Sequence, residues 1–185
     1  MISKTEVKMY RLGILSDTHG LIPSEVFEKF KNVDAILHAG DIGNPDVLLD
    51  LQVLALVYAV RGNTDFFGGA RKLPKERIMT FGPVRIGMIH GDQYSRASLL
   101  PNLEQHFAKA GVDIIVFGHT HQFYLKQHGP HWLANPGCAN PALSGKCPTG
   151  ILLTIAGKDE FTFEKVVFAH KGMEVSDDCD YNALD

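Results

Sequence analysis

Short apolar runs alternate with helical patterns along the first third of the chain, and this alternation restricts the fold more than any other feature. Three segments have the apolar character of buried strands: Arg11–Leu15, Asp34–His38 and Leu54–Val60. Two segments that begin with proline, Pro23–Phe30 and Pro45–Leu51, separate them and suit short helices. Because strands that alternate with helices form βαβ units, the sequence predicts an α/β fold with a parallel core.

The rest of the chain contains more strands than helices. Apolar residues at helical spacing predict one helix over Ser98–Ala110, which Gly111 ends. The expected strands are Arg77–Phe81, Val84–Ile89, Ile114–Phe117, Phe123–Gln127, Trp132–Ala134, Ile151–Ile155 and Phe161–Phe168. Glycine-containing bends between several of them predict antiparallel pairing. We therefore expect layers of helices around one mixed sheet or two sheets.

Length and charge exclude several classes of protein. The 185 residues suit a single domain over residues 1–185, with a core of about 9–170 and an acidic tail, Ser176–Asp185, that frays. A net charge of −3 and the lack of a basic stripe argue against a nucleic-acid partner. No apolar run approaches the roughly 20 residues of a membrane span, so no membrane partner is expected.

The cysteines and the N-terminal residues bear on the cellular compartment. Cys138, Cys147 and Cys179 are odd in number and irregularly spaced, which predicts free thiols in a reducing environment. The first ten residues lack the apolar segment of a secretory signal. Both observations predict a cytoplasmic protein.

Polar clusters follow five of the predicted strands, at the point where each strand ends. They are Asp17-Thr18-His19, Gly40-Asp41, Gly62-Asn63-Thr64-Asp65, His90-Gly91-Asp92 and Gly118-His119-Thr120-His121. Ligands of open α/β sheets bind at the carboxyl ends of the strands, so neighbouring strands are expected to bring these clusters into one crevice. Any one cluster alone is an ordinary polar turn, but five in this position indicate a common site.

The residue types in these clusters are metal ligands. In an extended segment, residues two apart point to one face, so Asp17 with His19, and His119 with His121, are expected to act together. The seven candidate donors are Asp17, His19, Asp41, Asn63, His90, His119 and His121. Seven donors exceed the needs of one metal with an open position and suit two metals bridged by a carboxylate. Imidazole and oxygen donors without thiolate favour Mn²⁺, Fe or Zn²⁺ over a structural zinc site.

Two neighbouring features remain open at this point. His38 ends a predicted strand, which is more typical of a packed histidine with a satisfied hydrogen bond than of a ligand. The segment Asn135-Pro136-Gly137-Cys138 is either a simple turn or a further border of the crevice.

The motifs SDTHG, HAGDIG, VRGNTD, IHGD, FGHTHQ and NPGC together resemble those of the calcineurin-like metallophosphoesterase superfamily. The resemblance is strongest to its small YfcE-like phosphodiesterases, a branch related to the retromer-subunit fold, and covers about Arg11 to Phe168. It implies a four-layer αββα sandwich with mixed sheets. It also implies a divalent-metal-dependent phosphodiesterase in which a bridging hydroxide attacks phosphorus in line.

The resemblance also implies how the donors divide between two divalent ions. One ion is held by Asp17, His19, Asp41 and His121, and the other by Asp41, Asn63, His90 and His119. Asp41, Asn63 and His90 are then the catalytic residues, with Asp41 as the bridge. Mn is the favoured metal, with Ni, Fe, Co or Zn as alternatives. Asp65 and Asp92 are candidates for orienting the ligand imidazoles.

Two positions depart from the family pattern. Thr64 stands where many members have a histidine that protonates the leaving group, and a threonine hydroxyl is a poor acid. The enzyme is therefore expected to prefer good leaving groups or to use another proton donor. After NPGC, where close relatives often carry a phosphate-binding arginine, this chain has Ala142, Leu143 and then Lys146.

A small phosphodiester is thus the expected substrate, and a homo-oligomer is a reasonable expectation for a protein of this size. A nuclease is disfavoured because phosphate contacts along a nucleic acid need Lys and Arg. The alternative outside enzymes is a protein-binding scaffold of the retromer-subunit type, which should expose an apolar patch.

Overall fold

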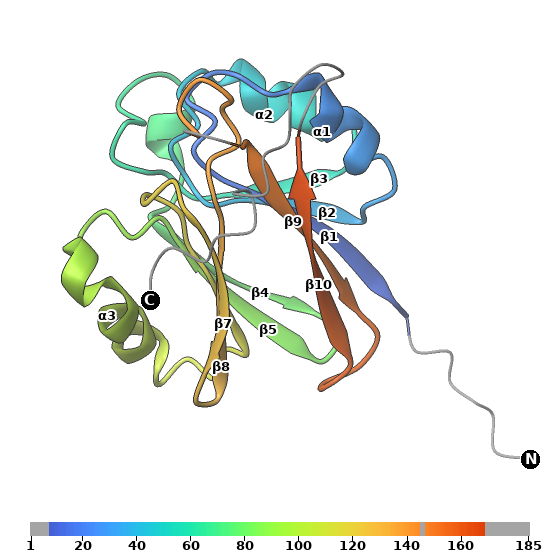
Figure 1. Ribbon diagram of the computed structural model, residues 1–185, viewed down its shortest axis with the longest axis vertical. Coiled ribbons are helices and arrows are strands. Elements are labelled where there is room, and N and C mark those ends of the chain that lie inside the picture. The colour runs from blue at the N-terminus through green and yellow to red at the C-terminus, as the bar shows by residue number, and fades with distance from the viewer. Residues whose placement is uncertain (1–7, 145–146, 169–185) are drawn as a thin grey trace, which may run out of the picture.

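Two five-stranded mixed sheets form the centre of the protein (Figure 1). The computed structural model describes residues 8–144 and 147–168. The first sheet has the order β10 (Phe161–Val167), β9 (Thr149–Ile155), β1 (Tyr10–Leu15), β2 (Ala35–His38), β3 (Leu56–Ala59). The second has the order β4 (Glu76–Phe81), β5 (Val84–Ile89), β6 (Ile114–Val116), β8 (His131–Pro136), β7 (Phe123–His128).

Helices cover the outer face of each sheet, which completes four layers. Helices α1 (Ser24–Lys29) and α2 (Asp46–Gln52) lie over the first sheet, and α3 (Leu99–Phe107) lies over the second (Figure 1). Two short 3₁₀ turns, η1 (Ala70–Lys72) and η2 (Arg96–Ser98), lie in the connections.

The strands in the middle of each sheet are apolar on both faces because each face packs against another layer. On β2, Leu37 belongs to the core between the sheets, whereas Ile36 belongs to the core under α1 and α2. On β6, Ile114 faces the other sheet and Ile115 faces α3. This burial explains why these strands appear in the sequence as continuous apolar runs rather than as alternating patterns.

The parallel pairing of the inner strands determines where the polar clusters lie. Strand β2 pairs in parallel with β1 and β3, and β6 pairs in parallel with β5 and β8. The carboxyl ends of β1, β2 and β3 therefore meet at one edge of the first sheet, and those of β5 and β6 at one edge of the second. All five polar clusters follow these ends.

The predicted α/β fold with two sheets is confirmed, with corrections at three elements. Helix α3 ends at Phe107, and Gly111 takes a left-handed φ of 61° in the turn beyond it. Strand β3 is shorter than predicted because Leu54 and Ala55 still donate to the carbonyl of Leu51 at the end of α2. The later strands are not all antiparallel, since β8 lies parallel to β6. The acidic tail Ser176–Asp185 falls outside the described residues.

The expectation of three free thiols is wrong for one cysteine. Cys138 is a buried free thiol, whereas Cys147 is disulfide-bonded. Cys179 lies outside the described residues. The prediction of a reducing compartment therefore loses the support of Cys147. Among the described residues, no helix has the length and apolar character to cross a membrane.

Candidate metal centre

The loops after β1 and β2 run side by side, and this pairing brings the first two polar clusters together. The amide of Asp17 donates to the carbonyl of Gly40 at 3.0 Å, and the amide of His19 donates to the carbonyl of Asp41 at 3.0 Å. The loop after β5 joins them from the other sheet, because His90 Nδ1 donates to the carbonyl of Ala39 at 2.8 Å. The site therefore lies where the edges of the two sheets meet.

A left-handed backbone is the conformational feature that the candidate ligands share. Within the described residues, the non-glycine positions with positive φ are five: Asp17, His19, Asp41, His119 and His121, with φ between 44° and 67°. All five are among the seven predicted donors. Such conformations are uncommon outside glycine and concentrate at functional sites, where surrounding contacts hold them.

This geometry corrects one step of the sequence argument. Asp17 and His19 do act on one site, as do His119 and His121, but not because their segments are extended. Each segment instead curls through two left-handed residues, which bends the chain around the point that the side chains face.

Four side chains, the first ligand group, converge most closely. They are Asp17, His19, Asp41 and His121, and they offer donor atoms that all lie within 4.8 Å of one another. His19 Nε2 lies 3.2 Å from His121 Nε2 and 3.7 Å from Asp41 Oδ2. His121 Nε2 lies 3.3 Å from Asp17 Oδ1. Donor atoms at about 2.0–2.2 Å from one metal are separated by such distances.

The atoms at the centre of the site lack partners within the protein, and this fits a metal ion. Among the described residues, three buried side-chain atoms have no hydrogen-bond partner: both carboxylate oxygens of Asp17 and Nε2 of His90. His121 Nε2 approaches Asp17 Oδ1 to 3.3 Å without a hydrogen bond. A buried ionised carboxylate without hydrogen bonds is costly, and such groups are normally paired or coordinate a metal. The unpartnered atoms belong to two of the seven predicted ligands.

The second ligand group shares Asp41 and adds Asn63, His90 and His119. Asp41 Oδ2 lies 3.4 Å from His90 Nε2 and 3.7 Å from His19 Nε2, so one oxygen faces both groups. The bond from Nδ1 to the carbonyl of Ala39 fixes the His90 ring, so its Nε2 is directed into the site. Asn63 Oδ1 and His119 Nδ1 lie 3.2 Å apart and form a hydrogen bond with each other. The structure thus brings all seven predicted donors to one place.

Charge coupling within the site displaces several pKa values. Burial tends to lower the pKa of His90, but the Asp41 carboxylate, 3.4 Å from Nε2, outweighs this and raises the pKa to about 9. Burial tends to raise the pKa of Asp41, yet the close approach and charge of His90 hold it well below its usual range. The Asp17 carboxylate, 3.3 Å from Nε2, raises the pKa of His121 to about 10, with help from Cys138. Burial and the charge of His90 lower the pKa of His119.

His38 is a packed histidine, as predicted, but it also links two ligand loops. Burial lowers its pKa to about 3, so the ring is neutral. His38 Nδ1 accepts from the amide of Gly40, so Nε2 carries the proton and donates to Thr18 Oγ1 at 2.9 Å. The Thr18 hydroxyl in turn donates to the carbonyl of Ile42. This chain of hydrogen bonds holds Thr18, between Asp17 and His19, against the loop of Asp41.

Asp65 and Asp92 do not orient ligand imidazoles in the way the sequence suggested. Asp65 is buried and accepts only backbone amides: those of Ile42 and Gly43 at Oδ1 and that of Gly62 at Oδ2. It therefore ties the second and third ligand loops together. Asp92 is exposed, and its charge acts on His119 by tending to raise the pKa of that ring.

The segment after β8 borders the crevice, which decides the alternative left open for Asn135-Pro136-Gly137-Cys138. The buried Asn135 donates from Nδ2 to the carbonyl of Gly118 at 2.8 Å and to Thr120 Oγ1 at 3.1 Å, on either side of His119. Cys138 donates from Sγ to the carbonyl of Asp17. Asn140, which sequence reasoning missed, donates to the carbonyl of Thr18. The one feature of the sequence that could have indicated Asn140 is its position shortly after this segment.

Two glycines are required because the backbone presses against ligand carboxylates. A Cβ at Gly62 would collide with Oδ1 of Asp41, and a Cβ at Gly118 would collide with Oγ of Ser16 and lie 2.9 Å from Oδ2 of Asp17. Side chains at either position would therefore displace a ligand. These two glycines are part of the site because their backbone lies directly against the side chains of ligands.

A family comparison agrees with this geometry. The model of the calcineurin-like phosphoesterase superfamily domain matches residues 10–158. The chain belongs to this superfamily. A probable metallophosphoesterase of Methanothermobacter thermautotrophicus is 37% identical over 153 residues, which cover 80% of this chain and 87% of the relative. The protein is accordingly a probable metallophosphoesterase.

Solved structures show the same fold at lower identity. A zinc complex of Vps29 from Entamoeba histolytica has a TM-score of 0.69 and 24% identity, covering 86% of this chain and 99% of that one. A structure described as a novel archaeal phosphodiesterase has a TM-score of 0.67 and 23% identity, covering 85% of this chain and 99% of that one.

Proposed function

We propose that this single-domain protein is a phosphodiesterase that uses two divalent metal ions, with a small phosphodiester as its substrate. The observation that carries the proposal is the set of unpartnered buried atoms on Asp17 and His90, which lie in the two ligand groups on either side of Asp41. The similar fold of a protein described as an archaeal phosphodiesterase supports the diester over the monoester.

In this proposal the two ions divide the ligands as the family resemblance implies. Asp17, His19, Asp41 and His121 would hold one ion, and Asp41, Asn63, His90 and His119 the other. Two divalent ions in such a site supply a nucleophile at neutral pH and stabilise the charge that develops on the phosphoryl oxygens. Mn²⁺ is the first candidate because the donors are imidazoles and oxygens, with Ni, Fe, Co and Zn as alternatives.

The chain's own residues orient the site before substrate arrives. Asp41 keeps one oxygen between the two groups, while its other oxygen accepts from the amide of Thr64 at 2.9 Å. Thr64 therefore serves by fixing this carboxylate rather than by donating a proton to the leaving group. Without a histidine at that position, the protein should act best on diesters of acidic alcohols, whose alkoxides need little protonation.

The test is hydrolysis of bis-p-nitrophenyl phosphate by chelator-treated protein, before and after addition of Mn²⁺, Ni²⁺, Co²⁺ or Zn²⁺. We expect activity only with metal, because p-nitrophenolate leaves without help from an acid. Asp41→Asn should abolish it by removing the shared charge, whereas Asp159→Asn, at an exposed carboxylate outside the site, should keep it. Near-normal turnover in Asp41→Asn would refute the two-metal site.

Protein binding is a second candidate function, favoured by exposed apolar side chains near α2. Leu49 and Val53 are one helical turn apart and are 61% and 81% exposed, and Leu56 at the start of β3 is 62% exposed. If folded, metal-loaded protein hydrolyses no diester, this surface becomes the principal functional candidate. A homo-oligomer that uses this surface and a cytoplasmic location remain expectations of the same proposal.

A further inference from the structure

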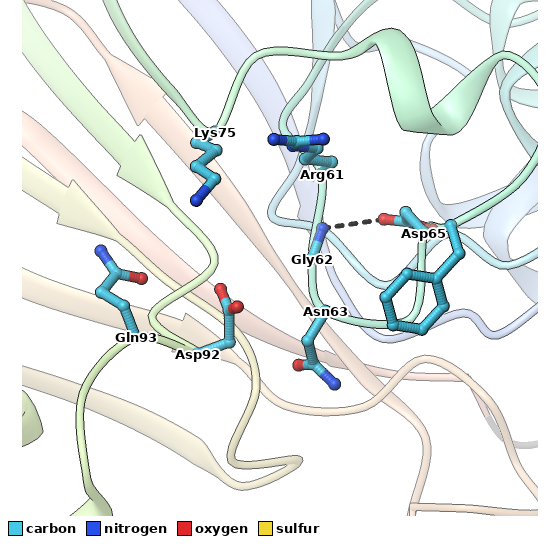
Figure 2. Close-up of a pocket in the computed structure, with 8 residues that line it drawn as sticks. Arg61, Gly62, Asn63, Asp65, Lys75, Asp92 and Gln93 are labelled. Atoms are coloured by element: carbon cyan, nitrogen blue, oxygen red, sulfur yellow. Dashed lines mark hydrogen bonds between the residues drawn. The ribbon is translucent and has the colours of Figure 1, made fainter.

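A pocket of about 320 Å³ opens beside the second ligand group, and its walls come from the connection between β3 and β4 and from the loop after β5 (Figure 2). The lining residues are Arg61, Gly62, Asn63, Asp65, Phe66, Lys75, Asp92 and Gln93. We call it the Lys75 pocket. Asn63 belongs both to this pocket and to the second ligand group, so the pocket adjoins the candidate metal centre. Its volume suits one arm of a small substrate rather than a whole large ligand.

The charges of the pocket favour an anion. The Asp65 carboxylate is buried and three backbone amides bind its oxygens, so it is not free to face a ligand in this space. The free charged groups that line the pocket are then two cations, Arg61 and Lys75, and one carboxylate, that of Asp92. Within the described residues, no ion pair engages Lys75 or Arg61. Figure 2 shows Lys75 and Asp92 on opposite walls, with their charged ends directed into the space between them.

Hydrogen bonds hold the backbone of the pocket walls in place beside the loop of Asn63. The amide of Arg61 donates to the carbonyl of Pro74, which anchors the residue before Lys75 to the loop that carries Asn63. The Arg61 guanidinium donates to the carbonyl of Arg71 at 3.2 Å and keeps further N–H groups for a ligand. Phe66, 65% exposed, adds an aromatic surface at the rim.

We propose that the Lys75 pocket selects phosphodiesters that carry a second anionic group, a phosphate or carboxylate, on one arm. This inference rests on the proposed function and names its substrate class. The scissile phosphate lies at the metals, the second anion lies between Lys75 and Arg61, and the frame that joins them passes Phe66. Lysine and arginine are the side chains that recognise phosphate by charge and by paired hydrogen bonds.

The test compares two chromogenic diesters that differ only by one phosphate: thymidine 5′-(p-nitrophenyl phosphate) and its 3′-phosphorylated form. Both release p-nitrophenol, so their ratio of kcat/KM reports the second phosphate alone. We expect the phosphorylated form to be favoured about fivefold, the effect of one partly exposed charge contact. Lys75→Gln should bring the ratio close to one. The matched control is Lys72→Gln, at an exposed lysine outside the pocket, which should leave the ratio unchanged.

Asp92→Asn should change the ratio of kcat/KM in the opposite direction. It removes the only free carboxylate of the pocket, so the ratio should rise about threefold. Calorimetric titration of Mn²⁺-loaded protein with thymidine 3′,5′-bisphosphate and with thymidine 5′-phosphate measures the same preference without turnover. Equal affinities, or equal effects of Lys75→Gln and Lys72→Gln, would overturn the inference. Failure to hydrolyse bis-p-nitrophenyl phosphate would instead overturn the proposed function, and the titration would still decide the role of the pocket.

Discussion

The two ligand groups use similar side chains but differ in how far the protein itself satisfies them. In the first group, Asp17 has two buried oxygens without hydrogen-bond partners. In the second group, Asn63 and His119 already bond to each other, and Asn63 is exposed. The first group also contains an internal hydrogen bond, between Nε2 of His19 and Nε2 of His121. It nevertheless holds two buried carboxylate oxygens for an ion to satisfy, whereas the second group holds one buried nitrogen, Nε2 of His90. This difference predicts unequal roles for the two groups.

The largest effect should come from ligand removal in the first group. Asp17→Asn keeps the size of the side chain but removes the buried charge. We expect kcat for bis-p-nitrophenyl phosphate to fall by more than about 100-fold, beyond the effect of losing an outer-shell partner. Asn63→Ala in the second group should cost about 10- to 100-fold while leaving the melting temperature nearly unchanged. Equal losses in both variants would remove the distinction between the groups.

Metal binding should occur in two steps of different affinity. An ion in the first group satisfies two buried carboxylate oxygens and an ion in the second group satisfies one buried nitrogen, so the second ion should bind about five- to tenfold more weakly than the first. Calorimetric titration of chelator-treated protein with Mn²⁺ measures both steps. Because the pKa values of His90 and His121 are raised to about 9 and about 10, each step should also release about one proton at pH 7. A single class of equivalent sites would contradict this order.

The stability of metal-free protein should fall at alkaline pH. His90 and His121 have pKa values raised above the ordinary 6.5, so their contribution is complete below that pH and is lost as pH rises through about 9 and about 10. We expect the melting temperature to drop by about 4 °C between pH 7 and pH 10.5. Saturating Mn²⁺ should reduce this drop, because the ion replaces the protons. An equal decline with and without metal would show that these histidines do not face the ions.

The smallest effect is expected at Thr64, which contacts the carboxylate shared by both groups. Its amide bond to Asp41 survives substitution of the side chain. Thr64→Ala should therefore change the hydrolysis of bis-p-nitrophenyl phosphate by less than about threefold. Thr64→His should speed the hydrolysis of diesters with poor leaving groups, by supplying an acid. A large loss in Thr64→Ala with the activated ester would assign the hydroxyl a catalytic role.

The strands and the convergence of the seven candidate donors could be predicted because each depends on local pattern: buried apolar runs, and polar residues directly after them. The left-handed backbone of Asp17 or His121 could not, since it arises from contacts between loops that are distant in sequence. For the same reason, sequence reasoning missed the linking roles of His38 and Asn135. His38 reaches the Thr18 hydroxyl and Asn135 reaches the carbonyl of Gly118, and no residue pattern records such contacts between loops.

The loop between Asp65 and Lys75 has fixed ends, and this has a consequence for how such proteins diversify. Asp65 is bound by three amides, and the carbonyl of Pro74 is bound by the amide of Arg61. Exposed residues between these two anchors, such as Phe67, can be exchanged without moving a metal ligand. A lineage built on this scaffold can therefore change what it cleaves by altering one loop, while the machinery that breaks the bond is inherited intact.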